Sequence, residues 1–116
     1  MAADVVDLKV SLKEFFGFDS FKGMQEEVIS TIMQGDDCFV IMPTGAGKSL
    51  CYQLPAVMSK KKTIVIAPLI ALIEDQVSSL KECGVNVEQL HSNQSREELA
   101  YSWKNFKNGK TNILYI

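Results

Sequence analysis

The segment Met42–Ser49 constrains the fold more than any other feature of the chain. It stands between an apolar run at residues 38–41, which is typical of a buried strand, and a helical pattern over residues 48–54. Gly45 and Gly47 allow positive φ angles and let the backbone approach a ligand without a Cβ in the way. A strand, a glycine-rich loop and a helix in this order predict a phosphate-binding loop in an α/β fold.

The groups of this loop suit a nucleoside triphosphate. Successive backbone N–H groups and the positive end of the following helix attract phosphate oxygens. Lys48 suits the terminal phosphates as a point charge and is the candidate catalytic residue, and the Ser49 hydroxyl suits Mg²⁺. The residues predicted to bind the phosphates of the nucleotide are Met42, Pro43, Thr44, Gly45, Ala46, Gly47, Lys48 and Ser49. Met42 replaces the first glycine of the general motif G-x-x-x-x-G-K-[ST]. The alternative is a glycine-rich turn with no ligand.

Outside the loop, helical and strand patterns alternate. Helices are predicted over residues 8–16, from a Ser20 cap to Gly35, over 69–82, and after a Ser95 cap, where Trp103 is expected in the core. Strands are predicted over residues 38–41, 63–67, 85–90 and 112–116. This alternation predicts an α/β fold with a parallel sheet covered by helices on both faces, preceded by N-terminal helices. The apolar run at 113–116 is expected to form an unprotected edge of that sheet.

Composition limits the classes of partner. The chain has 116 residues, 47% of them hydrophobic, and a net charge of −2, so it carries no overall basic footprint for nucleic acid. No apolar run reaches the length of about 20 residues that a membrane span needs. The N-terminus lacks the pattern of a secretory signal, and the three cysteines are expected to be free buried thiols. We therefore expect an intracellular protein, in the nucleus of a eukaryote or in the cytoplasm or nucleoid of a bacterium.

A second pattern precedes the loop. Leu12, Phe16-Gly17, Phe21-Lys22 and Gln25 fit the spacing L-x₃-F-G-x₃-F-[RK]-x₂-Q. A glutamine amide has both a donor and an acceptor, so Gln25 can pair with N6 and N7 of adenine. Phe16 and Phe21 are expected to wall the base, with the Lys22 cation near its face or the phosphates. The alternative is an amphipathic helix with Gln25 on its solvated side.

Together these segments resemble the RecQ family of superfamily 2 DNA helicases. The spacing that ends at Gln25 resembles the adenine-reading motif of that family, and the loop at 42–49 resembles its phosphate-binding motif. Residues 67–77 and 90–94 resemble two motifs that face single-stranded DNA. The resemblance implies an ATP- and Mg²⁺-dependent enzyme that unwinds single-stranded or forked DNA substrates with 3′-to-5′ polarity. The residues that it assigns to DNA contact are Pro68, Leu69, Ser92, Asn93 and Gln94.

The resemblance also implies a division of the chain by role. Residues 1–34 are expected to form a helical segment with the adenine-reading motif, and residues 35–116 the first, incomplete part of a RecA-like domain. The Asp-Glu-Ala-His motif of the family is absent from these residues and is expected after residue 116. We therefore expect this polypeptide to bind nucleotide without turnover. A different P-loop NTPase and an inactive nucleotide-binding or interaction fragment are the alternatives.

Overall fold

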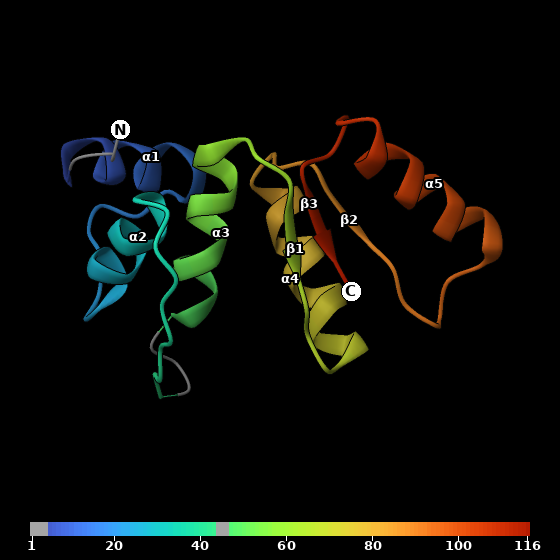
Figure 1. Ribbon diagram of the computed structural model, residues 1–116, viewed down its shortest axis with the longest axis horizontal. Coiled ribbons are helices and arrows are strands. Elements are labelled where there is room, and N and C mark those ends of the chain that lie inside the picture. The colour runs from blue at the N-terminus through green and yellow to red at the C-terminus, as the bar shows by residue number, and fades with distance from the viewer. Residues whose placement is uncertain (1–4, 44–46) are drawn as a thin grey trace. The chain divides into compact units, whose positions relative to one another are not determined.

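The computed structural model of the chain describes residues 5–43 and 47–116 (Figure 1). Its internal contacts divide the chain into two compact units, residues 1–59 and residues 60–116. The described part of the first unit is helical, and the second unit carries a parallel sheet with two helices. The predicted boundary between residues 34 and 35 divides the chain by role rather than by contacts, and it stays a prediction.

The first unit is built from α1 (Val5–Phe16), α2 (Gln25–Met33) and α3 (Lys48–Ser59). Each helix contributes to one apolar cluster, which consists of Leu8, Leu12, Ile29, Leu50 and Leu54. Burial of a leucine or isoleucine side chain contributes about 1.5–3 kcal/mol, so this cluster holds the three helices together. α1 ends where predicted, because Gly17 adopts a φ of 76°.

The start of α2 differs from the prediction. Ser20 was the expected cap, but the helix begins at Gln25 and Met24 stands at its N-cap position. Gly23 has a φ of 51°, which lies in the left-handed region and cannot continue a right-handed helix. Residues 20–24 therefore form a turn, in which the Gln25 backbone N–H donates to the Lys22 carbonyl at 3.0 Å.

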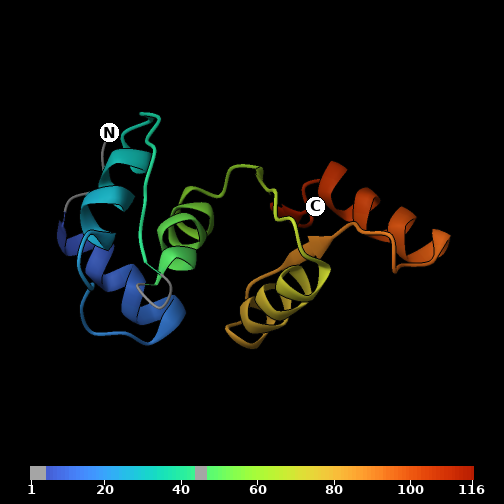
Figure 2. The same cartoon turned by 90° about the horizontal axis from the view of Figure 1, so that it is seen from below.

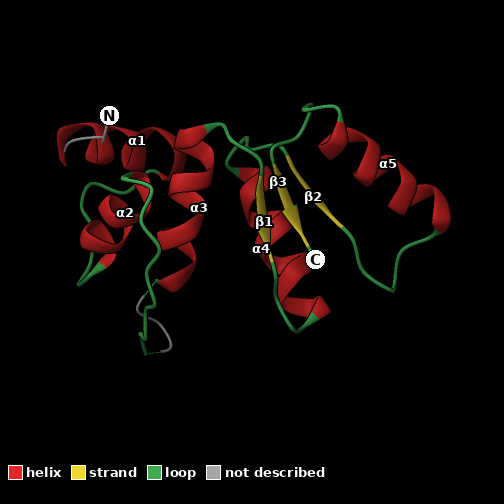
Figure 3. Cartoon of the chain, viewed as in Figure 1, coloured by secondary structure: helices red, strands yellow, loops and turns green. Residues whose placement is uncertain are grey.

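The prediction of a strand at residues 38–41 is wrong for this structure. Figure 3 draws these residues as a loop, and Phe39 and Ile41 are 90% and 83% exposed. A strand forms only when a neighbour satisfies its backbone N–H and C=O groups. Among the described residues, none pairs with this segment in a sheet. The segment is apolar, as a buried strand would be, but in the described part of the chain it lacks the neighbouring strand that the prediction required.

The second unit contains β1 (Thr63–Val65), α4 (Ile70–Glu82), β2 (Val87–Gln89), α5 (Arg96–Lys107) and β3 (Ile113–Tyr115). All pairings are parallel, in the order β1-β3-β2, which confirms the predicted α/β class. The connection from β1 to β2 runs across the sheet in one direction, and the connection from β2 to β3 runs back. Right-handed crossovers then place α4 and α5 on opposite faces, as Figure 2 shows.

The expectation of an unprotected edge at 113–116 is also wrong. β3 is the central strand, and Ile113, Leu114 and Tyr115 are all buried. Exposed apolar surface is found instead on β1, where Ile64 is 54% exposed, and just after it at Ile66, which is 79% exposed. The helices therefore cover the middle of the sheet but not this face of β1.

Two further expectations about burial need correction. Trp103 was placed in the core but is 51% exposed. Of the cysteines, all free, only Cys51 is buried, whereas Cys38 and Cys83 are exposed. None of the described helices combines the length and apolar character that crossing a lipid bilayer requires.

Candidate functional site

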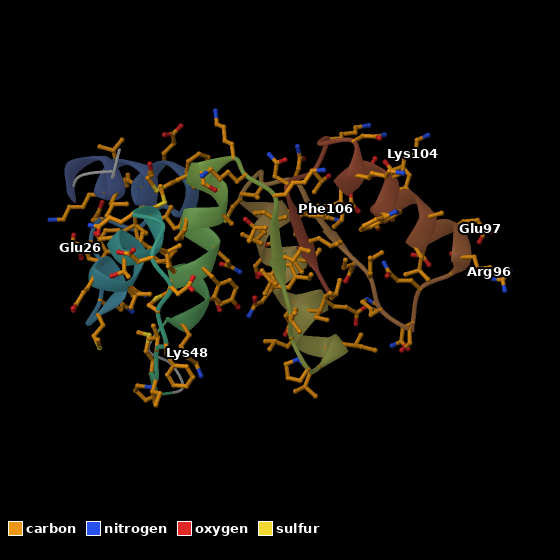
Figure 4. The ribbon with its side chains drawn as sticks, in the orientation of Figure 1. Glu26, Lys48, Arg96, Glu97, Lys104 and Phe106 are labelled. Carbon is orange, nitrogen blue, oxygen red and sulfur yellow. The ribbon has the colours of Figure 1, made fainter. Side chains whose placement is uncertain are left out.

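The phosphate loop leads directly into α3, whose first residue is Lys48 (Figure 4). No acidic residue stands in the first turn of α3, so nothing there neutralises the positive end of the helix dipole. A lysine at this position is unfavourable for the helix alone and becomes favourable when an anion binds. Lys48 is exposed, and Ser49 is half-buried one residue further on. This end of α3 therefore has the electrostatics of an anion site.

The structure brings the two predicted ATP-binding segments together at Gln25. This side chain is only 4% exposed, and its Nε2 donates to the Gly47 carbonyl at 3.0 Å. Its Oε1 accepts a hydrogen bond from the Lys22 backbone N–H at 2.8 Å. This burial excludes the alternative in which Gln25 lies on the solvated side of an amphipathic helix. The amide joins the start of α2 to Gly47 of the phosphate loop, the residue directly before α3.

Gly47 itself shows why glycine occupies this place. Its φ is 76°, and a Cβ added to it would collide with the Gln25 amide nitrogen. The close approach of the two segments therefore depends on the absence of a side chain at this position. Pro43 is exposed, and Met42 is half-buried with its Sδ atom 4.0 Å from the Cys51 Sγ atom. Thr44, Gly45 and Ala46 lie outside the described residues.

A pocket of about 250 Å³ lies where these segments meet. Its polar lining includes Lys22, Gln25 and Ser49, and its apolar walls include Phe16 and Phe18. Phe21, which was expected to wall the base, packs against the apolar cluster of the first unit instead. Phe18 lines the pocket instead, and its side chain is 55% exposed.

Sequence reasoning also missed Leu50 and Gln53 as lining residues. A signal for Gln53 was available, since it follows Ser49 by four residues on α3 and shares its helix face. Burial raises the pKa of the neighbouring Cys51 thiol, so this cysteine stays protonated beside the loop.

The second unit places the two predicted DNA-contacting segments at one edge of its sheet. Pro68 and Leu69 follow β1, and residues 92–94 follow β2. Because both strands run parallel, their carboxyl ends lie at the same edge, where open α/β sheets bind ligands. Leu69 is 63% exposed, and Ser92 and Asn93 are exposed as well.

The turn after β2 is held by its own side chains. Gln94 Oε1 accepts from the His91 backbone N–H at 2.8 Å, and the Asn93 backbone N–H donates to His91 Nδ1 at 3.3 Å. His91 Nε2 lies 3.1 Å from Gln89 Oε1, to which it donates when Nδ1 accepts. Ser95 and Glu98 then form a capping box that starts α5. The Gln94 side chain therefore stabilises the turn, whereas Ser92 and Asn93 are exposed to solvent.

Within residues 5–43 and 47–116, no cluster of histidine, cysteine or acidic side chains forms a metal site. A divalent ion would therefore need the oxygen atoms of a bound ligand in addition to the Ser49 hydroxyl.

Residues 22–116 match the model of the DEAD/DEAH box helicase family. The chain belongs to this family. The fold of a DEAD/DEAH domain is RecA-like, in agreement with the predicted class. Among similar proteins, "ATP-dependent DNA helicase Q5" of Rattus norvegicus is 53% identical over 114 residues, which are 94% of this chain and 12% of that protein. "ATP-dependent DNA helicase RecQ" of Bacillus subtilis (strain 168) is 42% identical over 106 residues, 90% of this chain and 18% of that protein.

"RecQ-like DNA helicase blm-1" of Caenorhabditis elegans is 43% identical over 112 residues, 95% of this chain and 11% of that protein. These relatives confirm the resemblance to RecQ helicases that the motifs indicated. The chain spans less than a fifth of the length of each of these three proteins.

Proposed function

We propose that this DEAD/DEAH box chain is the ATP-binding part of a RecQ-type DNA helicase that moves 3′-to-5′ on single-stranded or forked DNA. The observation that carries the proposal is the hydrogen bond of 3.0 Å from Gln25 Nε2 to the Gly47 carbonyl. It joins a base-reading amide to the end of a phosphate loop inside one pocket. A phosphate loop of another P-loop NTPase has no need of a buried glutamine at this position.

The Gln25 amide is held in place but keeps capacity for a base. Its oxygen has two lone pairs and its nitrogen two protons, and the contacts with Lys22 and Gly47 use one of each. The remaining lone pair and proton match N6–H and N7 of adenine. Phe16 and Phe18, which line the same pocket, offer apolar surface to the base.

For the phosphates, Lys48 at the start of α3 supplies a positive charge opposite the anionic terminal oxygens of ATP, and this charge would stabilise the negative charge that develops during phosphoryl transfer. Mg²⁺ fits the site through the Ser49 hydroxyl, because this ion prefers oxygen ligands and usually retains phosphate and water oxygens. When bound, Mg²⁺ neutralises charge on the phosphates. Thr44, Gly45 and Ala46 complete the predicted loop.

The DNA partner is proposed to run over the carboxyl edge of the sheet in the second unit. Pro68, Leu69, Ser92 and Asn93 are exposed there, and Gln94 holds the second turn. Backbone N–H groups at helix N-termini are common phosphate contacts, and α4 and α5 both begin at this edge.

Competition between ATP and GTP for a fluorescent nucleotide tests the nucleotide part of the proposal. Wild-type chain should prefer ATP by roughly tenfold or more, the equivalent of one or two lost hydrogen bonds for guanine. Gln25→Ala should remove the preference, whereas Lys48→Ala should weaken both nucleotides equally. Gln34→Ala, at an exposed glutamine after α2, is the matched control.

Three outcomes of the competition experiment would contradict the proposal. An ATP preference that survives Gln25→Ala would show that another group reads the base, and the assignment of Gln25 would fail. A chain that binds neither nucleotide, while circular dichroism shows that it is folded, would favour the inactive-fragment alternative. A preference for GTP would favour a different class of P-loop NTPase.

A further inference from the structure

One face of α5 carries a row of exposed side chains with an aromatic ring among cations. Its members stand at positions i, i+4, i+7, i+8 and i+11, which share one side of a helix. We call them the α5 stripe: Arg96, Ala100, Trp103, Lys104 and Lys107. All are exposed, and Figure 4 shows the labelled Arg96 and Lys104 on the outer side of the helix.

The indole of Trp103 packs on one side against the ring of Phe106. Its ring centroid lies 6.2 Å from that of Phe106, with an interplanar angle of 37°. Phe106 is 6% exposed, and the Lys62 Nζ atom lies 5.5 Å from the centroid of its ring. That ammonium group also donates to the Lys107 carbonyl at 3.1 Å. The inner side of Trp103 is therefore backed by a packed ring, while 51% of its surface stays open.

The charge of the stripe opposes that of the chain. The whole chain has a net charge of −2, whereas the stripe carries the cations of Arg96, Lys104 and Lys107. In the described parts of both units, none of these three forms a salt bridge with an acidic side chain. Of the two acidic residues in the first turn of α5, Glu97 borders the stripe, whereas Glu98 forms the capping box with Ser95. The result is a local basic surface, which overall composition conceals.

We propose that the α5 stripe binds single-stranded nucleic acid, with Trp103 stacked on a base and the three cations on phosphates. Exposed aromatic rings among cations are how proteins bind single strands without sequence preference. Arg96 to Lys107 spans about 16 Å along the helix, enough for consecutive nucleotides. The inference rests on the proposed function and extends its DNA path beyond residues 92–94, which directly precede α5.

An anionic membrane surface is the other partner that a basic aromatic helix can suit. Interfacial helices bury a broad apolar face with several large side chains. The α5 stripe offers one such side chain, Trp103, with Lys104 and Lys107 beside it. Nucleic acid is therefore the better match.

The fluorescence of Trp103 gives a local test, because it is the only tryptophan of the chain. The 116-residue chain is titrated with oligothymidylate and, in parallel, with an abasic oligonucleotide of the same length. Anisotropy of a labelled strand reports binding, and quenching of the indole reports stacking. We expect both strands to bind, and only the strand with bases to quench Trp103.

Variants separate the parts of the stripe. Trp103→Ala should weaken oligothymidylate binding roughly 5- to 150-fold, the usual range for loss of one stacked base. Lys104→Gln and Lys107→Gln should each reduce the slope of log affinity against log salt by about 0.7. Lys9→Gln, at an exposed lysine of α1, is the matched control and should change neither quantity.

Binding of oligothymidylate without quenching, and with unchanged affinity in Trp103→Ala, would overturn the inference and leave DNA binding elsewhere in place. Absence of any strand binding by a folded chain that still prefers ATP would overturn it too, while the nucleotide part of the proposed function stands. Quenching without any ATP preference would support the stripe and contradict that nucleotide part. A response to anionic phospholipid vesicles but not to oligothymidylate would replace DNA by a membrane surface.

Discussion

Replacement of Gly47 by alanine tests the geometry on which the nucleotide site depends. The new Cβ would meet the Gln25 amide nitrogen, and the backbone φ of 76° is unfavourable for any residue with a side chain. The substitution therefore has two free-energy costs. The left-handed conformation costs about 1–2 kcal/mol, and displacing the Gln25 amide costs about 1 kcal/mol for its hydrogen bond. We expect Gly47→Ala to lower the free energy of unfolding by about 2–3 kcal/mol.

Gly17 provides a control for the first of these costs. It lies in the same unit, has the same φ of 76°, and has nothing within 4 Å of an added Cβ. Gly17→Ala should therefore cost only the conformational strain, about 1–2 kcal/mol. The difference between the two variants measures the collision with Gln25.

A double-mutant cycle isolates that collision directly. In a Gln25→Ala background the amide is gone, so Gly47→Ala should cost no more than Gly17→Ala. The coupling between positions 25 and 47 should be about 1 kcal/mol. Urea unfolding followed by circular dichroism, with hydrogen exchange of α2 amides as a probe of the first unit alone, measures all four states. Strictly additive effects would refute the claim that Gln25 and Gly47 are in contact.

Two other predictions concern single ionisable groups. Hydrogen bonds from the Ser95 backbone and side chain hold the pKa of Glu98 below its ordinary value, so Glu98 stabilises the folded state above its unfolded pKa. This stability should be lost as the pH falls below the ordinary pKa of a glutamate and through the lower pKa of folded Glu98, and Glu98→Gln should remove that part of the pH dependence of unfolding. Cys38 and Cys83 are exposed, whereas Cys51 is buried and burial raises its pKa, so iodoacetamide should modify the first two well before Cys51. Mass spectrometry of digested samples checks the order, and early labelling of Cys51 would contradict its burial.

Features that depend on local chemistry were predictable from the sequence. The capping box of Ser95 and Glu98 fixes the start of α5, and Gly17 ends α1 through its positive φ. The role of Gln25 in the site was predicted from its spacing, but its hydrogen bond to Gly47 was not, because that bond joins residues far apart in the sequence.

Features that depend on a distant partner were not predictable in the same way. Residues 38–41 have the composition of a buried strand, but composition does not say which strand will pair with them. Residues 113–116 were expected at an edge and became the centre of the sheet. In both cases the segment is apolar as predicted. Its place in or outside the sheet depends on which strands pair, and no local sequence pattern encodes that pairing.

Trp103 shows that the orientation of a helix is as hard to predict from sequence as the order of strands. Its spacing with Leu99 and Phe106 is that of a helix core stripe, and Phe106 is indeed buried. On the helix, however, Trp103 stands between the buried face and the row of Arg96 and Lys107, so a small rotation decides its exposure. The packing of α5 against β2 fixes that rotation. An aromatic residue at the border of a basic face is therefore better treated as a candidate binding residue than as part of the core.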